Sequence, residues 1–132
     1  MENKKFEVRV ELVIQLTQQD IDDIMTGALE GGINYWCFKV DVLGEYLGEY
    51  ASEQISRGGS LKLYDSESGE KYWLDLEKFL KGFELWVENG GDQYGAIQGE
   101  AGGAIVVDCC EIDAGCADEI IQYALFGEVV YG

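Results

Sequence analysis

The stretch LKLYDSESGEKYWLDLEKFLKGFELWV, residues 61–87, decides the fold class. Residues 61–64 (LKLY) and 71–74 (KYWL) flank the segment DSESG, residues 65–69. The Asp, Ser and Gly residues between them favour a turn, so the two runs predict a β-hairpin with a loop of about five residues. Asp75 is a helix-capping residue type, and the apolar side chains after it recur at helical spacing. A hairpin followed by a helix is typical of an α+β domain.

The residues before the hairpin predict two more strands and two more helices. Thr17, followed by Asp20 three residues later, has the spacing of a capping box. Glycine accepts the left-handed conformation that often ends a helix, so Gly31 and Gly32 are expected to terminate this one. The expected elements are a strand at 6–16, a helix at 17–32, a strand at 34–43 and a helix at 44–57.

The residues after the hairpin complete the prediction. Residues 89–103 are rich in glycine and are expected to form a flexible loop. A strand is predicted at 104–112, a helix capped by Asp113 at 113–126, and a short strand at 128–131. The sequence thus predicts one α+β domain over residues 1–132, with a mostly antiparallel sheet of about five to six strands packed with three to four helices.

Composition excludes several function classes. The 132 residues include 26 Asp and Glu against 9 Lys and Arg, a formal charge of -17. Phosphate contacts depend on Lys and Arg, which argues against direct binding to nucleic acid or to an anionic membrane. Histidine is absent, which excludes catalysis by an imidazole base and coordination of a metal by an imidazole ring. No motif for a nucleotide or another cofactor is found, and an enzyme is not expected.

The N-terminus lacks an apolar signal core, and no apolar run approaches the ~20 residues that span a bilayer. We therefore expect a cytoplasmic protein, in the cytosol of a bacterial host. Asp65, Glu67 and Gly69 match part of the spacing of a calcium-binding loop. Leu76 occupies the position where that loop requires a carboxylate, so a hairpin turn is the better interpretation. No metal site is expected.

Four cysteines, Cys37, Cys109, Cys110 and Cys116, allow two disulfides or one zinc site in principle. Adjacent cysteines on a strand point to opposite faces, and no pair has the spacing of a zinc knuckle. Reduced thiols buried as small apolar side chains are the favoured interpretation.

The negative charge is concentrated in two places. Residues 82–132 contain no Lys or Arg and ten acidic residues. Glu45, Glu49 and Glu53 recur every four residues on the expected helix at 44–57, about 6 Å apart, comparable with phosphates along a nucleic-acid strand. Acids in the first turn of a helix also offset its dipole and need no partner. The candidate partner-binding residues are Glu45, Glu49, Glu53, Glu100, Asp108, Glu111, Asp113, Asp118 and Glu119.

Residues 119–131 repeat the pattern of 23–35: an acidic helix start, an apolar stripe, a glycine and a segment ending in tyrosine. Either a duplication or two helices with the same capping requirement explains this similarity.

At ALEGGINYW (28–36) and ADEIIQYALFGEVVYG (117–132), the chain resembles small acidic proteins carried by phages and mobile elements of Gram-positive gut bacteria. Some proteins of that kind are anti-restriction or anti-CRISPR DNA mimics. The resemblance implies an inhibitor that occupies the basic nucleic-acid channel of a bacterial defence nuclease or another DNA-binding protein.

The alternative is a small non-enzymatic interaction or scaffold module. It would form a homodimer through sheet edges or exposed aromatic residues such as Tyr94, Tyr123 or Tyr131. A weak metal-binding or catalytic role is a third possibility. A salt-sensitive complex favours the mimic, and a salt-insensitive dimer favours the module.

Overall fold

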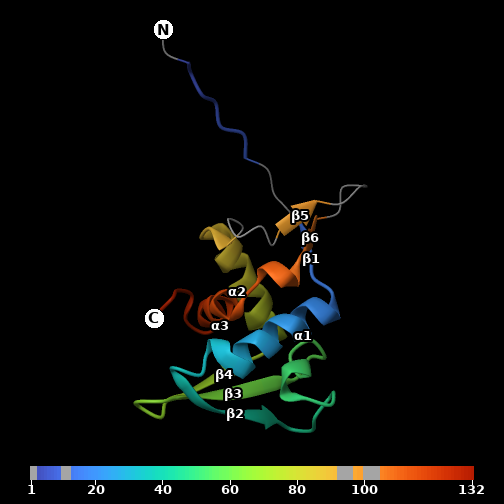
Figure 1. The fold of residues 1–132 in the computed structure, drawn as a ribbon, viewed down its shortest axis with the longest axis vertical. Helices are drawn as coiled ribbons and strands as arrows, with labels where there is room; N and C mark the ends of the chain where they lie inside the picture. Colours follow the sequence, from blue (N-terminus) through green and yellow to red (C-terminus); the bar gives the residue numbers. More distant parts are fainter. Residues whose placement is uncertain (1–2, 10–12, 92–96, 100–104) are drawn as a thin grey trace.

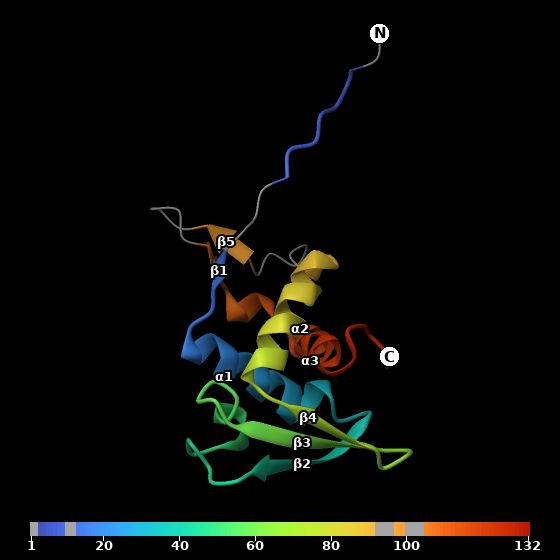
Figure 2. The same ribbon diagram turned by 180° about the vertical axis from the view of Figure 1, so that it is seen from behind.

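The computed structural model describes residues 3–9, 13–91, 97–99 and 105–132. An antiparallel sheet in the order β2-β3-β4 lies at one end, and the three α-helices lie on one side of it (Figure 1). A smaller sheet in the order β1-β6-β5 lies at the opposite end (Figure 2). The strands are β1 (Ile14–Gln15), β2 (Cys37–Leu43), β3 (Ser60–Asp65), β4 (Lys71–Leu74), β5 (Ile97–Gly99) and β6 (Ile105–Val107); the α-helices are α1 (Gln18–Gly27), α2 (Leu76–Glu88) and α3 (Ala114–Phe126).

The predicted hairpin of β3 and β4 is confirmed. Leu61 pairs with Leu74 and Leu63 with Tyr72, and the three leucines are buried under the helices. The neighbouring positions face outward, because successive strand side chains alternate between faces. At the turn, Asp65 Oδ1 accepts hydrogen bonds from the backbone N–H groups of Glu67 and Ser68, both at 2.8 Å. The turn therefore accounts for these residues without calcium.

The helix predicted from Thr17 is also confirmed, with a reciprocal capping box between Thr17 and Asp20. It continues beyond α1 as a π-helical turn, Ala28–Gly32. Among the described residues, neither Gly31 nor Gly32 has a positive φ, so the predicted left-handed stop is wrong. Gly32 is instead required by packing, because a Cβ there would collide with the carbonyl oxygen of Ala114.

The core lies between α2, α3, α1 and the inner face of the main sheet. Its largest fully buried side chains include Trp86 and Phe79 from α2 and Ile120 and Ile121 from α3. Helices α2 and α3 approach each other closely at Gly82, where a Cβ would lie 2.6 Å from the Cβ of Ala124. Asp75 and Asp113 cap the two helices as predicted.

The predicted α+β class is confirmed, but the prediction of one sheet of five to six strands is wrong. In the described part of the chain the strands fall into two three-stranded sheets, one of which includes the parallel pair β1 and β6. The strand predicted at 6–16 is limited to Ile14–Gln15 among its described residues, and Phe6 and Val8 are exposed. Alternation alone cannot form a strand when no neighbouring strand supplies hydrogen bonds.

Three other predicted segments differ. The strand expected at 104–112 ends at Val107 and is followed by a 3-10 turn, Cys109–Glu111. The loop expected at 89–103 contains β5, and most of the remainder lies outside the described residues. Residues 128–131 are not a strand; the backbone N–H groups of Val130 and Tyr131 donate to Gln122 Oε1. In the described ranges, no helix has the length and apolar character needed to cross a membrane.

Candidate partner-binding surface

Residues 44–50 do not form the predicted helix but an irregular loop held by two side chains. Gln54 is 1% exposed; its Oε1 accepts from Leu47 N at 3.0 Å, and its Nε2 donates to the carbonyl oxygen of Glu45 at 3.1 Å. Glu53 Oε1 accepts from Glu49 N at 2.8 Å and from Tyr50 N at 3.0 Å. These side-chain contacts replace the backbone hydrogen bonds of a helix.

Two glycines explain why the helical prediction is wrong. Gly44 has a φ of +75°, a left-handed conformation that interrupts a helix. Gly48 lies against the side chain of Glu53, where a Cβ would come within 2.8 Å of Glu53 Cβ. The row of Glu45, Glu49 and Glu53 therefore does not exist. Glu53 faces the loop, and its hydrogen bonds from Tyr50 and Glu49 hold its pKa below the usual value.

The loop presents large apolar side chains to solvent. Tyr46 is 60% exposed, Leu47 49% and Tyr50 62%. Tyrosines at fixed positions are common anchors of protein interfaces, because they bury a large area at a small loss of side-chain entropy. The segment has the character of a binding loop.

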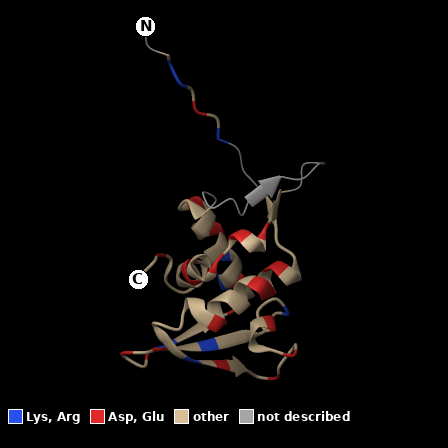
Figure 3. Ribbon diagram, viewed as in Figure 1, with Lys and Arg blue, Asp and Glu red and all other residues tan. Residues whose placement is uncertain are grey.

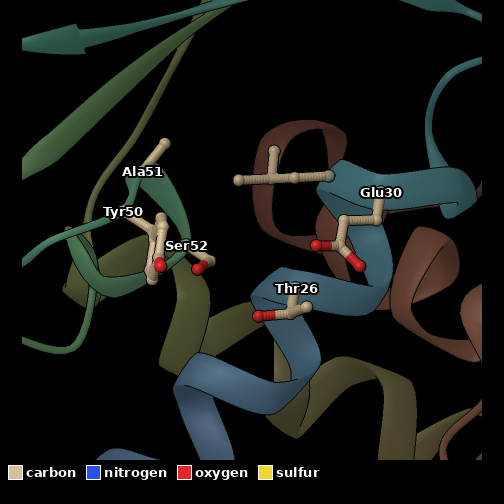
Figure 4. A pocket seen from close by; sticks show the side chains of 6 residues that line it. Thr26, Glu30, Tyr50, Ala51 and Ser52 are labelled. Atoms are coloured by element: carbon tan, nitrogen blue, oxygen red, sulfur yellow. The ribbon is translucent and has the colours of Figure 1, made fainter.

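A pocket of about 380 Å³ lies beside this loop (Figure 4). One wall comes from the end of α1 and the following π-helical turn, and the other from the 3-10 turn at Ala51–Glu53. Leu29 and Ala51 supply apolar lining, whereas Glu30 and Ser52 supply polar groups. Its size is at the lower end of the range for ligand sites, enough for a side chain of a partner.

The two walls are joined by an ion-pair network. Asp22, on α1, accepts from Ser56 Oγ at 2.6 Å and from Arg57 Nη1 at 3.3 Å. Arg57 also pairs with Glu53 at 3.4 Å. This network connects α1 to the segment after the 3-10 turn and so holds the two walls of the pocket next to each other.

Arg57, the cation of this network, does not neutralise the acidic residues exposed around the pocket. All nine Lys and Arg lie in the described part of the chain, and there none of them forms an ion pair with Glu30, Glu45 or Glu49. Glu45 and Glu49 are exposed on the loop, and Glu30 lines the pocket. We refer to the pocket, together with Glu45, Tyr46, Leu47, Glu49 and Tyr50, as the pocket surface.

The remaining candidate residues that the structure describes do not lie at this surface. Asp118 is 7% exposed, and its carboxylate accepts hydrogen bonds from Tyr35, Trp36 and Gln122. It is a core residue, which sequence reasoning did not foresee. Glu119 is half-buried, and burial followed by the charges of Asp118 and Asp113 raises its pKa.

Asp113 and Asp108 are helix caps: Asp113 accepts from Cys116 N and Asp108 from Cys110 N. Glu111 is exposed in the 3-10 turn between them, and Glu100 lies outside the described residues. This turn lies beside the start of α1, where Cys109 Sγ contacts the backbone oxygen of Asp20 at 3.6 Å. In the view of Figure 3, the acidic residues are spread over several helices and loops and do not form a single row.

The four cysteines are free thiols. Cys37 and Cys116 are buried as predicted, whereas Cys110 is exposed and does not pack as an apolar side chain. Tyr123 and Tyr131 are half-buried and so are not the exposed contacts expected of a dimer, and Tyr94 is outside the described residues. Within the described ranges no three potential ligands gather around a metal position.

The sequence carried one signal of this site, namely the glycines at 44 and 48 inside an apparent helix. The pocket itself unites residues 26–30 with 50–52, and their proximity is a property of the fold. Comparisons with protein-family models, with curated proteins and with solved structures give no match.

Proposed function

We propose that this chain is a non-catalytic binding protein whose pocket surface holds a basic segment of another protein. The observation that carries the proposal is a pocket of about 380 Å³ that combines apolar lining with the Glu30 carboxylate. A Lys or Arg side chain fits such a pocket, because its aliphatic stem can pack against Leu29 and Ala51 while its cationic group meets Glu30.

The exposed residues around the pocket favour a protein partner over a small molecule. Tyr46, Leu47 and Tyr50 are close to or above half exposed on a loop that Gln54 and Glu53 hold in place. A loop that is already ordered loses little conformational entropy on binding. Such a surface can bury aromatic anchors at the centre of an interface.

The charge of the chain favours a basic partner. A formal charge of -17 attracts a positively charged protein surface over a distance and increases the rate of association. Together with the resemblance noted above, this leads us to propose a bacterial DNA-binding protein, such as a defence nuclease, as the partner. Binding at its basic channel would exclude the nucleic acid, and inhibition would follow from that exclusion.

The first test measures complex formation with purified bacterial defence nucleases at about 50 mM and about 300 mM salt. We expect tight binding at low salt and loss of about tenfold or more at high salt, because exposed ion pairs are screened. Nuclease activity on DNA should fall in parallel. Equal affinity at both salt concentrations argues against the electrostatic part of the proposal.

Two variants then test the pocket surface. Glu30→Gln removes one charge with little change of shape, and Tyr50→Ala removes an exposed anchor. We expect each to weaken the complex by about tenfold, near 1.4 kcal/mol. Glu77→Gln on the exposed side of α2 is the matched control and should bind like the original chain.

The loop also supports a second candidate, a homodimer that buries Tyr46, Leu47 and Tyr50 of two copies. Sedimentation of the chain alone separates the two: a dimer that persists at about 300 mM salt and dissociates on Tyr50→Ala favours the homodimer. A monomer at both salt concentrations favours the basic partner.

A further inference from the structure

The outer face of the β2–β3–β4 sheet differs in chemistry from the rest of this acidic chain. The inner face of β3 carries Leu61 and Leu63, both fully buried, and its outer face carries Lys62 and Tyr64. The register places Trp73 opposite Lys62 and Lys71 opposite Tyr64. Because the described helices pack on the inner face, these outward side chains are left uncovered.

Lysines gather around one aromatic ring on this face. The ammonium groups of Lys39, Lys62 and Lys71 lie 5.1, 5.4 and 5.9 Å from the centre of the Tyr64 ring. Lys62 also lies 5.6 Å from the centre of the Trp73 ring. Lys78 adds a fourth cation at the edge, since its Nζ donates to the backbone oxygen of Trp73 at 2.8 Å. Three of the nine Lys and Arg of the chain thus lie around the Tyr64 ring.

Acidic residues neutralise only part of this cluster. The three strands contain two acids, of which Asp65 is buried and bonded to Tyr131. The other, Asp41, lies 3.7 Å from Lys39 and accepts a hydrogen bond from Tyr64 Oη at 2.7 Å. No ion pair of Lys62 or Lys71 occurs among the described residues. Lys62 and Lys71 are thus held close together without an acidic partner in the described part of the chain, and such a pair of cations favours binding of an anion.

Flat apolar rings flank the cations. Phe38 is 62% exposed and Trp73 is 50% exposed. The Phe38 ring lies 5.9 Å from that of Tyr64, so the three rings and the lysines form one continuous surface. An acidic peptide would use the lysines but has no need of exposed rings. Unpaired bases stack on aromatic side chains while lysines contact the phosphates between them.

We propose that this face binds single-stranded nucleic acid. The bases stack on Trp73 and Phe38, and the phosphates lie over Lys39, Lys62 and Lys71. The charge of the whole chain argues against such binding, but the relevant charge is local. At physiological salt, charges more than about 8 Å apart are largely screened, so acids on the helical side oppose association more weakly than the adjacent lysines favour it.

The experiment follows the fluorescence anisotropy of a labelled oligonucleotide of about 12 nucleotides at about 150 mM salt, where the screening length is about 8 Å. We expect saturable binding of the single strand and at least tenfold weaker binding of the same sequence as a duplex, whose bases cannot stack on the sheet. Absence of binding by the single strand, or equal affinity for the duplex, overturns the proposal.

Variants separate stacking from charge. Trp73→Ala should weaken binding about 5- to 150-fold, the loss of one stacked base, and Trp73→Phe should restore much of it. The double variant Lys62→Gln, Lys71→Gln should reduce the slope of log affinity against log salt by about 1.4. Lys81→Gln on α2 removes a cation away from this face and should change neither quantity.

A second copy of the acidic chain is the competing occupant of this face. Sedimentation at about 50 mM salt tests it, with the same Lys62 and Lys71 double variant. Self-association that the double variant abolishes, in a chain that binds no oligonucleotide, overturns nucleic-acid binding in favour of a second copy.

Discussion

Trp36 and Asp118, 82 residues apart in the sequence, are joined by a buried hydrogen bond in which the indole Nε1 donates to the carboxylate at 2.8 Å. Tyr35 Oη donates to the same carboxylate at 2.6 Å, and Gln122 Nε2 donates at 2.9 Å. The contact ties the segment before β2 to the middle of α3. Asp118, which the sequence analysis assigned to an acidic surface, thus stabilises the core.

Replacing Asp118 should therefore destabilise the fold. Asp118→Ala removes the acceptor of the buried Trp36 Nε1 and of Tyr35 Oη, and we expect a loss of about 3 kcal/mol in the free energy of unfolding. Urea denaturation measures the loss. Asp118→Asn keeps one acceptor oxygen and should lose less, and Glu88→Gln, at an exposed position, serves as the control. A stable Asp118→Ala protein would contradict the structural role.

The stability should also depend on pH at both extremes. Burial, together with the hydrogen bond to Asp118, raises the pKa of Tyr35 from 10.0 to about 12. A hydrogen bond to Asp65 raises that of Tyr131 further. A raised pKa gives stability that is complete below pH 10 and is lost as the pH rises through the folded value. Unfolding free energy should thus fall above pH 10.

At the acid end, the hydrogen bond from Tyr131 and those from the backbone of Ser68 and Glu67 lower the pKa of Asp65 from 3.8 to about 2. Its contribution is present above pH 3.8 and is lost as the pH falls toward 2. Tyr131→Phe removes the shared hydrogen bond and should flatten both limbs in a denaturation series against pH. Unchanged limbs in that variant would disprove the assignment.

Gly82→Ala should destabilise the protein although alanine is the better helix former by about 1 kcal/mol. The added Cβ would lie 2.6 Å from both Cβ and N of Ala124 on α3, so the two helices must separate. We expect a net loss of about 2 kcal/mol and a lower melting temperature. Gly31→Ala, in the π-helical turn at a position where an added Cβ meets nothing within 4 Å, isolates the effect of the glycine-to-alanine change itself. A higher melting temperature for Gly82→Ala would refute the close approach.

Only Cys110 of the four thiols should react rapidly with iodoacetamide in the folded protein, because the other three are buried or half-buried. Burial raises the pKa of Cys109 to about 12 and that of Cys116 to about 11, which further reduces their thiolate fraction. Mass spectrometry should detect one fast modification, absent in Cys110→Ser. Two fast modifications in the native state would be inconsistent with the fold.

Gln54→Leu should loosen the loop of the pocket surface. The variant keeps the bulk of the side chain but removes the acceptor of Leu47 N and the donor to Glu45 O, at a cost of about 2 kcal/mol. Hydrogen exchange at Leu47 should accelerate relative to exchange at the core of α3. Ser52→Ala, which leaves these hydrogen bonds intact, is the control, and unchanged exchange at Leu47 would show that Gln54 does not hold the loop.

The sequence alone determined the elements whose signals are local. The capping box at Thr17, the caps at Asp75 and Asp113 and the turn after Asp65 are contacts between residues two or three positions apart, so their spacing specifies them. The repeated pattern of 23–35 and 119–131 is also local, and it does not specify how each of the two helices ends. Helix α3 ends at Gly127 with a φ of +73°, whereas the helix that begins with α1 ends in a π-helical turn.

The tertiary structure alone decided which charges meet and which are buried. Glu45, Glu49 and Glu53 are evenly spaced in the sequence, yet Gln54 and two glycines hold their segment as a loop. Lys39, Lys62 and Lys71 are far apart in the sequence, yet the register of three strands places them around Tyr64. Charge along a chain is additive, but electrostatic interaction depends on distance and burial, and both are set by packing between segments that the sequence separates.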